Sequence, residues 1–144
     1  MTSNAARADI LVRALRAGIG NDGKPDADLY TEDVRAWTPA LAATSRDELL
    51  AELDRRDDAF SEIDLDVVPL DVGGDFACAE WTVTMIHSGP LPVAAGVIEP
   101  TGVRVTVHGA TVAEFRGEQI CSLRQYWDEL AVIEQLGLLS PDPE

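Results

Sequence analysis

The chain has 144 residues, 46% of them hydrophobic and 26% charged, which is typical of one folded domain and argues against a disordered chain. Its 26 acidic residues outnumber 11 Lys and Arg, and the net charge of −15 argues against nucleic acid or an anionic membrane surface as a partner. The sequence has no apolar run long enough to span a membrane and no signal-peptide core near its start. We therefore expect a single domain over residues 1–144, with a frayed tail at 140–144.

Helical patterns dominate the N-terminal part of the sequence. Apolar residues form a stripe at helical spacing within residues 5–17, and Arg7 lies off that stripe. A short helix is predicted at 25–30, because proline is tolerated in a first helical turn, and a short strand at 34–37. A Ser-x-x-Glu capping box at 45–48 predicts the start of a second long helix.

Four strands and a last short helix follow. The strands are predicted at 64–72, 76–87, 103–115 and 120–127, and the helix at 129–136. Gly-Gly between the first two strands and Arg-Gly-Glu-Gln between the last two are hairpin signals. Helices followed by antiparallel hairpins predict an α+β fold. We expect a curved antiparallel sheet wrapped around three helices, shaped as a cone with an internal pocket.

The connection at 88–102 is rich in proline and glycine at its ends, yet its middle is apolar. A linker of this length would be polar, whereas an apolar connection usually packs over other parts of the structure. The sequence therefore predicts that this segment covers either the pocket mouth or a partner subunit.

Four short motifs occur in one order along the C-terminal half of the sequence. His87 stands in Met-Ile-His-Ser-Gly, Pro-Thr-Gly at 100–102 opens a strand, and Gly-Glu-Gln-Ile at 117–120 forms a turn and the start of the next strand. Asp128 then lies seven residues before Gln135. In this order and spacing the motifs resemble those of the SnoaL-like polyketide cyclases.

The resemblance implies a nuclear-transport-factor-like α+β cone and a cofactor-independent enzyme of secondary metabolism. Such an enzyme cyclises or isomerises a hydrophobic, polyketide-like carbonyl compound by acid/base catalysis. Homodimerisation through the outer face of the sheet is a further expectation from the resemblance.

Asp128 matches the acid/base residue of that family, which removes a proton next to carbonyl groups and protonates the new alkoxide. An aspartate suits this role only where burial makes its carboxylate a stronger base. The residue also directly precedes the last predicted helix, where aspartate is a favoured N-cap. Catalysis and helix capping are both open for Asp128.

Two further ionisable side chains are predicted catalytic partners. His108 and Glu114 share one face of their strand by alternation, and a two-residue turn would place Glu114 opposite Cys121. Some cyclases carry a histidine on this strand, and its place falls on Glu114 here. Alternatively, this face is exposed to solvent or lies in a dimer interface.

Several apolar and polar residues are predicted to contact substrate. Aromatic side chains could stack on flat rings, although in a small domain they are commonly core residues. His87 ends a strand with an apolar face and lies either at the pocket rim or in a structural role. Limonene-epoxide-hydrolase-like proteins share this fold, and the position of their water-activating aspartate is occupied here by Gln125. Glutamine cannot act as a base, so hydrolysis of an epoxide by the same arrangement is not expected. Opening of an epoxide with Asp128 as a general acid is still possible. The predicted substrate-binding residues are His87, Trp37, Tyr30, Trp81, Met85 and Gln125.

Other kinds of site lack their sequence signals. Two His and two Cys without metal-ligand spacing predict neither a metal site nor a cofactor, and phosphate-loop and nucleophile-elbow motifs are missing. Cys78 and Cys121 lie within strands and are predicted to be reduced thiols in the cytoplasm. The partner expected is a small hydrophobic ligand, and the rival to an enzyme is a non-catalytic binding protein of the same fold.

Overall fold

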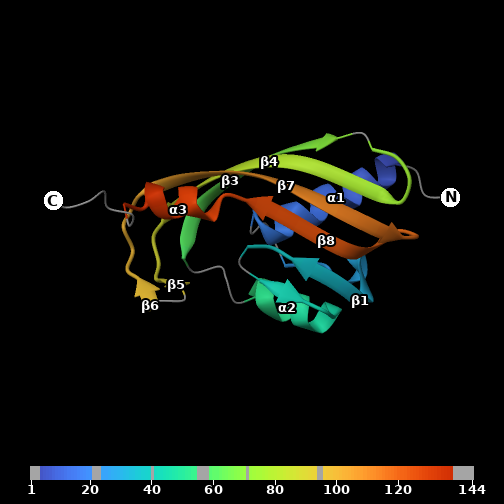
Figure 1. Ribbon diagram of the computed structural model, residues 1–144, viewed down its shortest axis with the longest axis horizontal. Coiled ribbons are helices and arrows are strands. Elements are labelled where there is room, and N and C mark those ends of the chain that lie inside the picture. The colour runs from blue at the N-terminus through green and yellow to red at the C-terminus, as the bar shows by residue number, and fades with distance from the viewer. Residues whose placement is uncertain are drawn as a thin grey trace.

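A computed structural model describes residues 4–20, 24–39, 41–54, 59–70, 72–93 and 96–137 (Figure 1). The predicted frayed tail at 140–144 lies outside the described residues. The elements are α1 (Asn4–Gly18), the 3-10 helix η1 (Ala27–Leu29), β1 (Tyr30–Trp37), β2 (Ala42–Ala43), α2 (Arg46–Asp54), β3 (Phe60–Leu70), β4 (Phe76–His87), β5 (Leu91–Val93), β6 (Gly96–Ile98), β7 (Arg104–Arg116), β8 (Gln119–Trp127) and α3 (Glu129–Gln135).

The described strands form a six-stranded curved sheet in the order β2-β1-β8-β7-β4-β3 and a separate β5-β6 hairpin. With the three α-helices, this confirms the predicted α+β fold. The sheet is mixed, however, because β1 and β8 are parallel, while every other pair of neighbouring strands in this described sheet is antiparallel. The prediction of a wholly antiparallel sheet is therefore wrong for this pair. β1 follows the N-terminal helical segments and is far from β8 in the sequence, so no hairpin forces the two strands to be antiparallel.

The helices cover the inner, concave face of the sheet. Helix α1 contacts β3 and β4, α2 contacts β1 and β2, and α3 contacts β7 (Figure 1). Leu11 and Leu15 of α1 are almost fully buried with Val34 and Val83 of the sheet. Burial of these side chains between helix and sheet is the main source of stability. Helix α3 lies at one end of the fold (Figure 1).

Arg7 of α1 is buried, although it lies off the apolar stripe of that helix. Its Nε and Nη2 donate to the carbonyl oxygen of Gly117 at 3.3 and 3.1 Å, and its Nη1 donates to that of Gly74 at 2.9 Å and to Asp75 Oδ1 at 3.1 Å. The guanidinium also lies 5.6 Å from the centre of the Phe115 ring. One side chain thus joins the β3-β4 and β7-β8 turns to α1.

The start of α2 has a capping box close to the predicted one. The Glu48 amide donates to Ser45 Oγ at 3.2 Å, while the Glu48 carboxylate accepts from the amide and hydroxyl of Thr44, one residue before the expected partner. These bonds lower the pKa of Glu48. Among the described residues, no helix is long and apolar enough to cross a membrane.

Candidate active site

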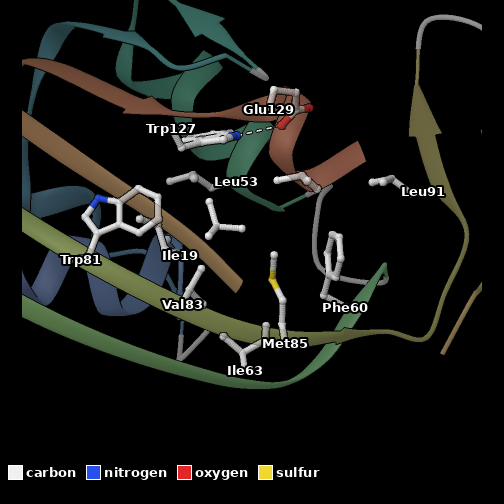
Figure 2. Close-up of a pocket in the computed structure, with 13 residues that line it drawn as sticks. Ile19, Leu53, Phe60, Ile63, Trp81, Val83, Met85, Leu91, Trp127 and Glu129 are labelled. Atoms are coloured by element: carbon white, nitrogen blue, oxygen red, sulfur yellow. Dashed lines mark hydrogen bonds between the residues drawn. The ribbon is translucent and has the colours of Figure 1, made fainter. Parts of the chain in front are cut away.

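An apolar cavity of about 200 Å³ lies between the helices and the sheet (Figure 2). All three α-helices or their ends contribute to its wall, as do β3, β4, β5, β7 and β8. A cavity of roughly 150 Å³ lined by apolar side chains is enough to bind benzene, so this one has room for a small ring system.

The local structure of each strand explains which side chains reach the cavity. On β4, Trp81 and Met85 share the inner face by alternation, and both of these predicted contact residues line the wall. On β3, a register shift between Ser61 and Asp64 lets Phe60 and Ile63 line the same wall. The shift includes Glu62, whose φ of 50° is unusual for a residue with a side chain.

The connection between β4 and β7 reaches the cavity through Leu91 of β5. Figure 2 shows Leu91 and Phe60 on the side of the cavity opposite Trp81. The apolar segment at 88–102 was predicted to cover either the pocket mouth or a partner subunit. Leu91 of this segment does contact the pocket.

Glu129 is the only ionisable side chain among the described residues that line the cavity. It belongs to the first turn of α3, where the helix dipole favours a negative charge. Trp127 Nε1 donates to Glu129 Oε1 at 2.8 Å, and Figure 2 shows this bond at the edge of the cavity. Because Glu129 is exposed, its carboxylate is open both to solvent and to a bound ligand.

Asp128 lies outside the described lining of the cavity. Its Oδ1 accepts from the amide of Ala131 at 3.1 Å, which is the geometry of a helix N-cap. Of the two roles predicted for Asp128, the structure shows helix capping. The carboxylate that lines the cavity belongs to the next residue, Glu129, which the sequence analysis did not identify. The adjacent pair of carboxyl residues after Trp127 was the available signal.

The expectation that His108 and Glu114 face the cavity is wrong. Val107, Thr111 and Phe115 of β7 are buried on the inner face, so the alternate residues point outward. His108 is exposed, with Nδ1 3.1 Å from Thr82 Oγ1 on the outer face.

The pairing of Glu114 also differs from the prediction. A bulge between β7 and β8 pairs Glu114 with Ser122 and leaves Cys121 as the extra residue. Burial, and then the Glu114 carboxylate, raise the pKa of the Cys121 thiol, which favours its protonated form. Both Cys78 and Cys121 are free thiols.

His87 is fully buried at the end of β4 and is not part of the described cavity lining. Its Nδ1 accepts from the Thr101 amide at 3.2 Å and lies 2.9 Å from Thr101 Oγ1. Since a backbone amide can only donate, the proton of the neutral ring must be on Nε2. The ring lies 5.6 Å from that of Phe60, so His87 supports one cavity wall from behind and anchors the Pro-Thr-Gly segment.

The remaining predicted contact residues lie away from the cavity. Tyr30 and Gln125 are buried elsewhere in the fold, and neither is part of the lining. Trp37 lies on the outer face of β1, 46% exposed, with its ring 5.4 Å from that of Tyr126. No group of three or more His, Cys, Asp or Glu within the described part of the chain is arranged to hold a metal ion.

Comparisons with known proteins show the same fold. The solved structures that are similar include a candidate SnoaL-like polyketide cyclase from Jannaschia sp. CCS1, at 21% identity and a TM-score of 0.77, with 95% of this chain and 94% of that chain covered. TsrD from Streptomyces laurentii is 21% identical with a TM-score of 0.78, covering 96% and 100%, respectively. IdmH, a candidate polyketide cyclase from Streptomyces antibioticus, is 16% identical with a TM-score of 0.73, covering 91% and 98%.

At these identities the similar structures establish the shared fold and leave the reaction open. Among curated proteins, none matches the chain. Residues 12–123 match the model of the SnoaL-like domain, and the match extends from α1 to the middle of β8. With its curved sheet, three helices and apolar cavity, the chain belongs to the SnoaL-like domain family.

Proposed function

We propose that the protein is an enzyme that cyclises or isomerises a hydrophobic, carbonyl-bearing small molecule by acid/base catalysis, with Glu129 as the group that transfers the proton. The observation that carries this proposal is one carboxylate at the edge of an apolar cavity, oriented by Trp127. Names given to similar structures, which include candidate polyketide cyclases, support the same class of reaction.

The proposed reaction needs only the side chains that line the cavity. Trp127 occupies Glu129 Oε1, so Oε2 can accept a proton from the carbon next to the carbonyl group. A bound apolar ligand would displace water from this carboxylate and make it a stronger base. Returning the same proton to another carbon gives an isomer. Alternatively, the enolate carbon attacks a second carbonyl group, and the proton goes to the new alkoxide oxygen, which gives a ring.

Proton exchange on a simple ketone tests the proposal without knowledge of the natural substrate. We expect the protein to accelerate the replacement of hydrogen by deuterium next to the carbonyl group of 2-tetralone in D2O, followed by NMR. Binding of 2-tetralone without acceleration of this exchange would contradict the catalytic proposal.

That contrary result would favour a non-catalytic binding protein. The specific observation in favour of this second candidate is that, within the described lining, Glu129 has no second ionisable partner to stabilise an enolate. The third function considered, acid-catalysed epoxide opening, would be favoured by Asp128 and Glu114 on one cavity wall. In the fold, Asp128 caps α3 and Glu114 faces outward.

We further propose that two copies associate through the outer face of the sheet, in a reducing compartment such as the cytoplasm, consistent with the two free thiols. Trp37 and Tyr126 are each 46% exposed there and lie against one another. Exposed aromatic side chains are enriched at protein interfaces. Sedimentation is expected to give a dimer for the wild type and a monomer for Trp37→Glu, whereas a wild-type monomer at micromolar concentration would contradict this.

A further inference from the structure

Gly109 of β7 lies between two tryptophans on adjacent strands. It pairs with Trp81 of β4 on one side and with Trp127 of β8 on the other. The two indole rings meet edge to face with their centres 6.1 Å apart. Both rings line the cavity, so the two tryptophans that flank Gly109 form part of its wall.

The space above Gly109 is filled by the Trp81 ring. A Cβ atom on residue 109 would lie 2.7 Å from Trp81 Cε2 and closer still to Cζ2 and Cη2. These distances are well inside normal contact, so a residue with a side chain would displace the ring. Gly109 is thus a case in which a strand needs glycine for close packing.

The displaced ring has one direction in which to move. Trp81 Nε1 donates to Thr111 Oγ1 at 2.9 Å, and both side chains are buried, so the nitrogen end of the ring is fixed to β7. Figure 2 shows this nitrogen pointing away from the cavity and the six-membered ring pointing towards it. A side chain at residue 109 would therefore lift the six-membered ring off the sheet and into the cavity.

We propose that Gly109 determines the depth of the cavity and thereby the size of the ring system that it accepts. With glycine at this position, Trp81 lies flat against β7, and the cavity can take a ketone with at least two fused rings. The class of ligand rests on the proposed function, whereas the role of Gly109 rests on the packing of Trp81. Because Trp127 also contacts Trp81 and donates to Glu129, Gly109 is in addition a positioning residue for the carboxylate.

Two ketones that differ by one fused ring test this inference, namely cyclohexanone and 2-tetralone. The variants are Gly109→Ala and the double variant Gly109→Ala with Trp81→Phe, in which a smaller ring compensates for the added methyl group. Ala110→Ser, a change of similar size on the outward side of the same strand, is the matched control. Dissociation constants are measured from the indole N–H resonances in 1H–15N NMR.

We expect Gly109→Ala to weaken 2-tetralone binding by about tenfold or more, as one methyl group can do in a fitted pocket. Cyclohexanone binding should change by less than about threefold, and the double variant should recover 2-tetralone binding to within about threefold, because the added volume is compensated. Equal weakening of both ketones, or no recovery in the double variant, would overturn the inference.

The inference and the proposed function can fail separately. If 2-tetralone binds with the expected size dependence but does not exchange its protons, catalysis fails and the role of Gly109 stands. If neither ketone binds, the unliganded variant decides: the Trp81 indole N–H resonance must move in Gly109→Ala, because the ring to which it belongs is displaced. An unchanged resonance would disprove the displacement on which the inference depends.

Discussion

Replacing Glu129 by glutamine is expected to slow the catalysed proton exchange of 2-tetralone by about 100-fold or more, which is the usual contribution of a general base. Glutamine has nearly the same size, and its amide oxygen can still accept from Trp127 Nε1, so the cavity keeps its shape. The amide cannot take up the ketone proton. The exchange rate is measured by NMR in D2O at saturating ketone, so that a change in binding does not affect the comparison.

Asp128→Asn is the matched control, because it removes the neighbouring carboxylate and keeps the helix cap. Asparagine caps helices about as well as aspartate, so the amide of Ala131 keeps an acceptor. The exchange rate should stay within about threefold of the wild type, since surface changes of this kind have small effects. A large loss in Asp128→Asn with a retained rate in Glu129→Gln would assign the chemistry to Asp128.

Replacing Arg7 by methionine is expected to lower the free energy of unfolding by roughly 1.5–3 kcal/mol, because the carbonyl groups of two turns lose the charged donor of a buried side chain. The substitution removes the hydrogen bonds from the guanidinium to the carbonyl oxygens of Gly117 and Gly74. Methionine fills a similar apolar volume, so the loss reports mainly on hydrogen bonding. The measurement is urea denaturation followed by tryptophan fluorescence.

Arg13→Met on the same helix is the control for this change. Arg13 is exposed and lies 3.4 Å from Asp26, and an exposed ion pair contributes about 0–1 kcal/mol. We therefore expect the control variant to unfold close to the wild-type midpoint. Equal losses in the two variants would mean that the contacts of Arg7 with the turns add little stability.

Features that depend on local chemistry were predictable from the sequence. The strand at 76–87 was predicted with the bounds that β4 has, because Gly-Gly precedes it and its residues alternate in character. Gly117 has a φ of 65° in the predicted tight turn, a conformation that favours glycine. Asp128 caps the helix that follows it, as its position before a short apolar segment indicated.

Features that depend on distant parts of the chain were not predictable. Nothing in the sequence of β1 indicates that it pairs in parallel with β8. Both alternate sets of residues on β7 contain apolar side chains, so alternation alone did not show which face Glu114 occupies. The bulge at Cys121 then changed the register that had been counted from the turn.

The proposed carboxylate of Glu129 lies one residue after the predicted Asp128, and the difference has a physical cause. The cap holds the Asp128 side chain on the backbone of α3, whereas Glu129 in the first turn reaches back to Trp127. Which of two adjacent carboxyl groups caps a helix depends on the residue at which the preceding strand ends. Composition alone does not fix that residue. Gly109, an isolated glycine within a strand, did carry a signal of close packing that the sequence analysis did not use.

The most direct test of the proposed site is the side-chain carboxyl 13C resonances of Glu129 and Asp128 during titration with 2-tetralone. If the cavity carboxylate is Glu129, its resonance should move in proportion to the bound fraction of ketone, and that of Asp128 should stay in place. Movement of the Asp128 resonance with a constant Glu129 resonance would contradict the proposal that Glu129 is the reacting group.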